Sequence, residues 1–477
     1  MSQQIDNIIK DEEGTYRDRM TTVDDSGKRR WLLPKKPFGS FFNKRQIVSY
    51  GLLILMIGVP FIHKILGLKN PLFLFDVIFR KEFFIFGQRF VSQDSFIFAV
   101  GALLFVVFII LFTTIFGRIW CGWLCPQTIF MEMIFRRIEH LIEGDTNKQR
   151  KLNKQAWNAE KIRKKGLKYF FFMLLSWIIT HMGVSWVIGV DKMQSMIFEN
   201  PANNLTFFIV MTVLTLVIFG TYIRFREQVC TTFCPYGRLQ GVMLGKDSMV
   251  VAYDYNRGEP KGRKNDPNAG DCIDCKACVN VCPTGIDIRN GTQLECVNCT
   301  ACIDACDDIM IKLDRPKRLI GFYSDNSLKT GEDFVFSIRQ KAYMVVLVAL
   351  LVFVTIITLN RTHLEANILR KPGQTYIVDE KTNVVTNMYD LNIINKVDEE
   401  LEFIVETNFK GATLQVVGFG SDEIYKVSPG EILHTQMLIS MDLEKTKGMK
   451  TLIDFQVKTP DGELLDDMES TFLAPKK

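Results

Sequence analysis

The chain has 477 residues, enough for several domains, and its formal net charge of +5 is small for that length. No nucleic-acid-binding motif, P-loop or dinucleotide fingerprint occurs in the sequence, so neither nucleic-acid binding nor nucleotide-driven chemistry is indicated. Long apolar runs alternate with strongly basic stretches, which is typical of a protein that crosses a membrane.

The first segment, residues 1–45, is polar and basic. We expect it to be poorly ordered except near Trp31–Phe42. The first apolar run begins near Gln46, behind this long segment, so it does not fit a secretory signal peptide and is interpreted as a retained membrane span.

Five apolar runs have about the 20-residue length that a helix needs to cross a bilayer. They are Ile47–Leu66, Ser95–Gly117, Lys168–Val190, Leu205–Tyr222 and Ala342–Leu359. Buried helices of a large soluble domain are the alternative. That alternative is disfavoured because a run such as Phe96–Phe116 carries no charge on any face.

The distribution of Lys and Arg predicts the orientation. Basic residues concentrate in the N-terminal segment and in the segments after the second and fourth spans, whereas the loop between spans three and four carries only Lys192. The positive-inside rule therefore predicts a bacterial inner-membrane protein with a cytoplasmic N-terminus and cytoplasmic large loops. Five spans then place the C-terminal segment in the periplasm.

The segment after about Thr362 is predicted to be all-β, because apolar and polar residues alternate in short runs between turn signals such as Ser428-Pro429-Gly430. The expected strands are Val384–Ile394, Leu401–Phe409, Thr413–Gly418, Glu431–Ser440 and Thr451–Val457. Their number and spacing favour a small immunoglobulin-like sandwich.

The 12 cysteines fall in four tight groups, and none lies in the last third of the chain. This grouping indicates metal ligation rather than a disulfide framework. Two groups repeat the bacterial ferredoxin spacing C-x-x-C-x-x-C-x-x-x-C, in which the fourth cysteine ligates the other cluster. One 4Fe-4S cluster is therefore assigned Cys272, Cys275, Cys278 and Cys306, and the other Cys296, Cys299, Cys302 and Cys282. Zinc, with four ligands per ion from paired C-x-x-C units, would leave half of these cysteines unexplained.

The other two groups form an internal repeat, because Cys121 and Cys125-Pro126 follow the first pair of spans as Cys230 and Cys234-Pro235 follow the second. Proline suits the first helical position, so Cys125 and Cys234 are expected at helix N-termini, which favour thiolate. Soft thiolates favour Cu(I), and four of them could form one redox or copper site. The residues Gln127–Glu143 then resemble an amphipathic helix on the membrane surface.

Two histidines, His63 and His181, lie in or near spans one and three. Ligation of a b-type haem or of copper is one interpretation, and helix packing is the simpler one.

Taken together, these motifs resemble the CcoG family, also called FixG or RdxA, accessory proteins of cbb3-type cytochrome c oxidase. The resemblance rests on Trp120-Cys-Gly-Trp-Leu-Cys-Pro-Gln127, on Cys230-Thr-Thr-Phe-Cys-Pro-Tyr-Gly-Arg-Leu-Gln240 and on the cysteine-rich segment from Asp271 to Asp308. It implies a cupric reductase in which electrons pass through two clusters to copper at Cys121, Cys125, Cys230 and Cys234. It also implies copper-transport and oxidase-assembly proteins as partners. The electron donor and any homo-oligomer are left open.

The expected fold is a multi-domain membrane protein. It combines a five-helix transmembrane bundle, an inserted ferredoxin-like α+β domain with two 4Fe-4S clusters, and a C-terminal all-β immunoglobulin-like sandwich. The expected parts are a cytoplasmic basic segment at 1–45, two transmembrane hairpins at 46–245, a ferredoxin domain at 246–335, a fifth span at 336–361 and a periplasmic domain at 362–477.

Two other classes of function compete with a metalloreductase. One is a membrane ferredoxin subunit of a quinol-linked chain, like the NapH and NosR groups, which share the C-x-x-x-C-P motif. The other is a copper carrier or scaffold without turnover.

Overall fold

The computed structural model describes residues 21–475 with the exception of 24, 25, 27, 77–81, 92, 93, 264, 265, 332, 333, 372, 374, 375, 380, 381, 398, 408, 410, 419–423 and 447. The expectation of disorder at the N-terminus concerns mainly residues 1–20, outside this range. The chain divides into two compact units: unit 1 comprises 1–61 with 100–352, and unit 2 comprises 62–99 with 353–477.

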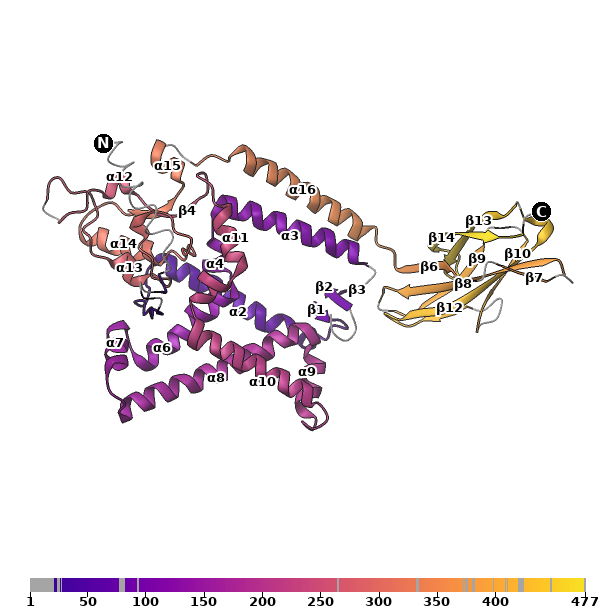
Figure 1. Ribbon diagram of the computed structural model, residues 1–477, viewed down its shortest axis with the longest axis horizontal. Helices are drawn as coiled ribbons and strands as arrows, with labels where there is room; N and C mark the ends of the chain where they lie inside the picture. The colour runs from indigo at the N-terminus through magenta and orange to yellow at the C-terminus, as the bar shows by residue number, and fades with distance from the viewer. Residues whose placement is uncertain are drawn as a thin grey trace. The chain divides into compact units, whose positions relative to one another are not determined.

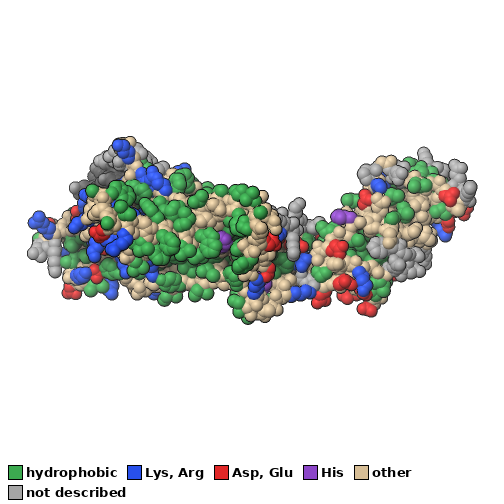
Figure 2. All heavy atoms as spheres, turned by 90° about the horizontal axis from the view of Figure 1, so that it is seen from below, with side chains coloured by type: hydrophobic (Ala, Val, Ile, Leu, Met, Phe, Trp, Pro, Cys, Tyr) green, Lys and Arg blue, Asp and Glu red, His purple; other side chains and the backbone are tan. Residues whose placement is uncertain are grey.

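Five helices are long and apolar enough to span a membrane, as predicted. They are α2 (Ser40–Leu66), α3 (Ser95–Phe116), α8 (Ala159–Ile188), α10 (Leu205–Gly220, continued to Phe225 by the π-helical turn η3, Thr221–Phe225) and α16 (Ile338–Leu359). α2, α8 and α16 begin before the predicted runs because the polar residues that precede each run also take up helical conformation. In Figure 2 hydrophobic side chains cover the helices of unit 1, and Lys and Arg gather toward one end.

The two C-x-x-x-C-P motifs lie in short helices next to the spans (Figure 1). The first motif is followed by an almost continuous helical stretch, and the second runs from Cys230 in η4 through Cys234 to Pro235, the first residue of α11. The elements are α4 (Ile119–Trp123), α5 (Pro126–Ile129), η2 (Phe130–Phe135), α6 (Arg136–Glu143), α7 (Thr146–Lys154), α9 (Val190–Phe198), η4 (Val229–Phe233) and α11 (Pro235–Met243).

The predicted membrane-surface helix over Gln127–Glu143 is instead largely buried within unit 1. It is broken into α5, η2 and α6, and Ile129 and Phe135 pack with Phe172 of α8 and Tyr222 of η3 in one hydrophobic core. The apolar stripe was therefore correctly recognised, but it faces protein rather than lipid.

The ferredoxin-like part of unit 1 consists of a two-stranded antiparallel sheet and short helices around the cysteine loops. β4 (Val250–Tyr253) pairs with β5 (Ile320–Tyr323), and the helical turns are α12 (Tyr255–Gly258), α13 (Ala277–Val281), η5 (Ile288–Asn290), α14 (Ala301–Lys312) and α15 (Asp325–Thr330). Its core joins strand residues such as Val251 and Ile320 to Ile303 and Met310 of α14.

Unit 2 contains a β-sandwich, as predicted. One sheet has the order β10-β12-β8-β6, with β7 also paired to β8, and the other has the order β11-β9-β13-β14. The strands are β6 (Leu364–Arg370), β7 (Ile377–Asp379), β8 (Val384–Asn395), β9 (Leu401–Thr407), β10 (Ala412–Val416), β11 (Tyr425–Val427), β12 (Ile432–Asp442), β13 (Lys450–Lys458) and β14 (Leu464–Leu473). A short 3-10 turn, η6 (Leu443–Lys445), follows β12. Alternate residues of β8 are buried in the shared core, as a half-buried strand requires.

A small sheet between the first two spans also belongs to unit 2. Its strands are β1 (Phe73–Asp76), β2 (Glu82–Ile85) and β3 (Gln88–Phe90). The buried Asp94 that follows accepts from Arg361 at 2.7 Å and from Lys396 Nζ at 2.9 Å. These ion pairs fasten the small sheet to the start of the sandwich.

Candidate metal centres

The first set of ferredoxin-type thiols surrounds one small cavity. Cys272, Cys275, Cys278 and Cys306 all line it, the first two from the loop before α13, the third from α13 itself and the last from α14. Burial raises the pKa of Cys306 to about 12, and the charges of Cys278, Cys275 and Cys272 add to the shift. Such mutual effects show that these four sulfurs are neighbours.

The second set brings Cys282 beside the loop that carries Cys296, Cys299 and Cys302. Burial raises the pKa of Cys296 to about 12, with further contributions from the charges of Cys282 and Cys299. The backbone N–H groups of Asn298 and Ala301 point at the sulfurs of Cys296 and Cys299. Amide donors of this kind stabilise a ligating thiolate and tune a cluster.

The two cysteine loops share an unusual backbone. Asp274 and Lys276 in the first loop, and Asn298 and Thr300 in the second, all have positive φ between 52° and 65°. In each loop these residues stand two and four positions after the first cysteine. Left-handed conformation is costly for non-glycine residues and persists where a site demands it. Here the left-handed conformation turns each loop so tightly that the successive cysteine side chains of that loop can face the same cluster position.

This donor set suits iron–sulfur clusters better than single ions. Among the described residues, no three His, Cys, Asp or Glu side chains converge as ligands of one metal ion. A 4Fe-4S cubane holds its four ligand sulfurs farther apart than a single ion does. Two groups of four thiols with ferredoxin spacing therefore fit clusters, and they do not fit preformed zinc sites.

The four C-x-x-x-C-P cysteines form a third group of thiols. Burial raises the pKa of Cys121 to about 11, an effect that Arg118 opposes and that the charges of Cys125 and Cys234 increase. Burial likewise raises the pKa of Cys230 to about 12, with contributions from Cys125, Cys121 and Cys234. The internal repeat in the sequence is thus a pair of facing motifs in the structure.

Polar side chains that the sequence did not single out hold this third group. Cys121 Sγ donates to Gln240 Oε1 at 2.9 Å, and Gln240 Nε2 donates to Thr113 Oγ1 at 3.1 Å. Thr128 Oγ1 lies 4.0 Å from Cys230 Sγ. Cys125 and Cys234 are the N-caps of α5 and α11, each followed by proline at the first helical position, as their sequence predicts.

Gly122 brings the third thiol group against the second cysteine loop. A Cβ at this position would lie 2.4 Å from Val297 O and 2.9 Å from Cys299 Cα, so only glycine permits the approach. Cys121 and Cys299 consequently share one hydrophobic cluster, and Cys302 packs against it. The C-x-x-x-C-P thiols and the second set of cluster thiols are therefore packed neighbours.

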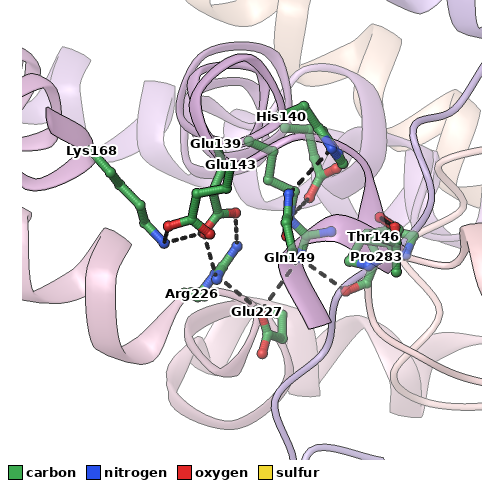
Figure 3. Close-up of polar contacts among 12 residues, drawn as sticks. Glu139, His140, Glu143, Thr146, Gln149, Lys168, Arg226, Glu227 and Pro283 are labelled. Carbon is green, nitrogen blue, oxygen red and sulfur yellow. Dashed lines mark hydrogen bonds and ion pairs between the residues drawn. The ribbon is translucent and has the colours of Figure 1, made fainter. Parts of the chain in front are cut away.

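A network of buried ion pairs in unit 1 connects the segments around the C-x-x-x-C-P motifs (Figure 3). Glu139 of α6 accepts from Arg226 at 2.6 Å and from Lys168 of α8 at 2.5 Å. Arg136 Nη2 lies 3.4 Å from Glu227 and donates to Pro283 O, next to Cys282, at 3.3 Å. The network joins α6, α8, the segment before the second motif and the ferredoxin loop.

Neither histidine belongs to a described group of metal ligands. His181 Nδ1 forms a hydrogen bond of 2.8 Å with Trp177 O, and the centroids of the His181 and Trp177 rings are 4.2 Å apart. These contacts fit the helix-packing interpretation of His181. His63 lies in unit 2, on the last turns of α2.

Comparisons with known protein families agree with this geometry. Families described as a 4Fe-4S binding domain and a 4Fe-4S dicluster domain match residues 98–145 and 225–325, respectively. Residues 354–475 match a family described as the Ig-like fold at the C-terminus of FixG, a candidate oxidoreductase. Every cysteine of the chain lies in one of the two 4Fe-4S matches.

Whole-chain relatives are similar over most of their length. Protein RdxA of Cereibacter sphaeroides is 34% identical over 355 residues, which cover 71% of this chain and 73% of RdxA. Protein RdxB of the same organism is 32% identical over 401 residues, with 79% of this chain and 81% of RdxB covered. The nitrogen fixation protein FixG of Rhizobium meliloti is 31% identical over 451 residues and 84% of each chain.

Proposed function

The chain belongs to the family of the FixG and RdxA proteins and is an iron–sulfur electron-transfer protein, and from this premise we propose that it reduces Cu(II) to Cu(I). Electrons pass through two 4Fe-4S clusters to copper held by Cys121, Cys125, Cys230 and Cys234. The Cu(I) formed then serves the assembly of cbb3-type cytochrome c oxidase, together with copper-transport and oxidase-assembly proteins.

The observation that carries the proposal is the contact between the C-x-x-x-C-P group and the second cysteine loop. Cys121 shares a hydrophobic cluster with Cys299, and Gly122 lies against the backbone of that loop. A short, dry path between two thiol groups suits the transfer of single electrons. It also gives the unusual burial of Cys121 a reason.

The proposed cluster ligands are those of the ferredoxin pattern. Cys272, Cys275, Cys278 and Cys306 hold one cluster, and Cys296, Cys299, Cys302 and Cys282 hold the other. The mutual charge effects within each set support this division. When bound, the clusters supply one-electron storage beside the copper thiols.

The copper site is proposed as a transient one for a substrate ion. Soft thiolates stabilise Cu(I) over Cu(II) and so favour the reduced product. Among the described residues no three of the potential ligands converge on one ion, so the site does not form a closed cage. Two of the four thiolates are enough to hold Cu(I), and an open site lets the product leave. Gln240 and Thr128 orient Cys121 and Cys230 for this purpose.

The proposed location is the bacterial inner membrane, with the N-terminus and all cysteines on the cytoplasmic side and the sandwich in the periplasm. The five span helices and the distribution of Lys and Arg support it. A reducing cytoplasm keeps these thiols free for metal ligation.

Separating copper binding from cluster binding tests the assignment. Serine at Cys121, Cys125, Cys230 and Cys234 together should abolish Cu(I) binding, measured against a competing Cu(I) chelator, and leave the cluster absorbance unchanged. The matched variant Cys275→Ser should lose cluster absorbance and keep Cu(I) binding. Undiminished Cu(I) binding in the fourfold variant would remove these four thiols from the copper site.

The alternative functions predict other outcomes. A membrane ferredoxin of a quinol-linked chain would show cluster reduction by a quinol and no Cu(II) reduction. A copper carrier would bind copper without any electron leaving the clusters.

A further inference from the structure

A large cavity in unit 1 lies beside the cysteine loops and has no role in copper binding. Its volume is about 870 Å³, within the ~300–1,000 Å³ typical of small-molecule sites. Its walls come from the segment around Pro34–Gln46, from η2 and α6, and from α13 and α14 of the ferredoxin part. We call it the Arg45 cavity.

Part of the lining of the Arg45 cavity adjoins both sets of ferredoxin-type cysteines in the sequence. Small or apolar residues form it: Ala277 and Val281 of α13, Pro283, and Ala301 and Ala305 of α14. Each is a direct neighbour of a cysteine from one of the two cluster sets or stands one residue away. Apart from Ile309 of α14, which also lines the cavity, the side chains here are small, so a planar ligand can approach both cysteine sets.

Five basic residues also line the cavity: Lys35, Lys36, Arg45, Arg136 and Arg137. Three acidic residues also line the cavity, and two of them are already paired: Glu132 with Arg136 at 3.2 Å and Asp308 with Lys312 at 2.6 Å. The third, Asp145, stands at the N-terminus of α7, where its side chain makes no capping hydrogen bond. Figure 3 shows Pro283 and His140, which also line the cavity, from the ferredoxin loop and from α6.

Arg45 is the residue that points to an anionic ligand. Its side chain is only 2% exposed, and its Nε and Nη2 atoms have no hydrogen-bond partner among the residues that the structure describes. A buried guanidinium without partners is costly, so such a group is normally satisfied by an anion.

We propose that the Arg45 cavity binds a flavin mononucleotide, with its phosphate on Arg45 and the lysines and its ring on the wall of α13 and α14. Guanidinium binds phosphate with paired hydrogen bonds. Phe38 and Phe42 supply apolar surface for a ring. An uncharged quinol would leave Arg45 unsatisfied. A nicotinamide gives up its two electrons together as hydride, which a one-electron cluster cannot take.

The electron balance of this step is simple. The reduced flavin loses two electrons and two protons and becomes the oxidised flavin. Each of the two clusters takes one electron, and the protons go to solvent. The flavin thus converts a two-electron donor into two one-electron transfers, which is the common role of flavins beside iron–sulfur centres.

Binding to the cluster-loaded full-length protein in detergent tests the site. We expect flavin mononucleotide to bind with quenched fluorescence, and riboflavin, which lacks the phosphate, to bind at least about tenfold more weakly. The substitution Arg45→Gln should weaken the binding of flavin mononucleotide by about tenfold and leave the binding of riboflavin unchanged. Lys317→Gln, which removes an exposed cation outside the cavity lining, is the matched control and should change neither.

Cluster reduction without copper is the second readout. Under anaerobic conditions, photoreduced flavin mononucleotide should bleach the cluster absorbance, more slowly in Arg45→Gln. Because copper is absent, a failed copper proposal leaves this result standing, and the reverse also holds. Equal binding of riboflavin and flavin mononucleotide would overturn the proposal.

An anionic phospholipid presents the same phosphate chemistry. Nanodiscs with and without phosphatidylglycerol separate the two sources. Flavin binding that is unaffected by phosphatidylglycerol supports the flavin site. The flavin site would be overturned by two results together: phosphatidylglycerol abolishes flavin binding in the wild type, and the Arg45→Gln variant retains less phosphatidylglycerol. The cavity would then hold a lipid headgroup.

Discussion

At the scale of single residues, Gly122 determines how closely the C-x-x-x-C-P thiols approach the second cysteine loop. Alanine at this position places a methyl group 2.4 Å from Val297 O, and overpacking of this kind costs about 1–3 kcal/mol. We expect Gly122→Ala to retain both clusters and copper binding but to slow electron transfer to copper, because the two thiol groups move apart. Single-turnover kinetics and cluster absorbance measure the two effects.

The control for this substitution is Gly183→Ala. Gly183 lies in the helix α8, and no atom of the described part of the chain is within 4 Å of an added Cβ. Its transfer rate should equal that of the wild type. A Gly122→Ala variant with the wild-type rate would mean that electrons do not cross at this contact.

The cysteines themselves were predictable from the sequence because ligand spacing is a local property of the chain. The residues around them were not. Gln240 reaches Cys121 from a motif 119 positions away, and Thr128 lies beside Cys230 of the other motif. Gly122 gains its role only where the chain meets the second cysteine loop. No local pattern distinguishes such residues from ordinary helix residues.

At the scale of secondary-structure elements, the ion network around Glu139 ties α6 to α8 and to the segment before the second motif. Burial alone would raise the pKa of Glu139, but the charges of Arg226 and Lys168 hold it well below its usual value. A carboxylate with a lowered pKa adds stability above its ordinary pKa of 4.5 and loses it as the pH falls below that value.

We therefore expect Glu139→Gln to cost about 3–5 kcal/mol at pH 7, because it leaves Arg226 and Lys168 buried with less compensation. The unfolding temperature of the wild type should fall as the pH is lowered below about 4.5, and that of the variant should depend less on pH. Thermal unfolding in detergent from pH 3 to pH 8 provides the measurement.

Glu160→Gln is the matched control, because Glu160 of α8 forms an ion pair with Lys164 on the protein surface. Its unfolding temperature should stay near that of the wild type. Equal unfolding temperatures for Glu139→Gln and Glu160→Gln would show that the buried network contributes nothing to stability.

The secondary-structure elements differ in how well their sequence pattern predicts them. The five spans and the long strands β8, β12 and β13 follow from hydropathy and alternation. The short strands β1–β3, β7 and β11 carry too few residues for a pattern, and β6 and β14 were also missed. The stretch over Gln127–Glu143 shows a different limit, because an apolar stripe does not reveal whether it will meet lipid or protein.

At the scale of the whole molecule, the proposed topology separates the cysteines from the sandwich. A cysteine introduced at the exposed Ser428 should react with a membrane-impermeant maleimide in intact spheroplasts. Thr330→Cys, on the exposed end of α15 in unit 1, should react only after lysis. The wild type, whose cysteines all precede residue 307, provides the background.

Reaction of Thr330→Cys and not of Ser428→Cys in intact spheroplasts would reverse the proposed orientation.

The number of spans and the class of each domain were predictable because they depend on composition over long stretches. The internal repeat alone suggested that the two C-x-x-x-C-P motifs come together. The contact between the first motif and the Cys299 loop could not be predicted, because it depends on how the chain folds back on itself.

The most direct test of the central claim is a single-turnover measurement of electron transfer from the clusters to copper. Anaerobic full-length protein, reduced and freed of excess reductant, is mixed with Cu(II) and a Cu(I)-specific chelator in a stopped-flow spectrometer. We predict that cluster absorbance recovers as Cu(I) appears, one Cu(I) for each electron lost, and that both signals vanish when Cys121, Cys125, Cys230 and Cys234 are replaced by serine. Clusters that stay reduced in the presence of Cu(II), or that reoxidise at the same rate in the fourfold variant, would contradict electron transfer through these thiols.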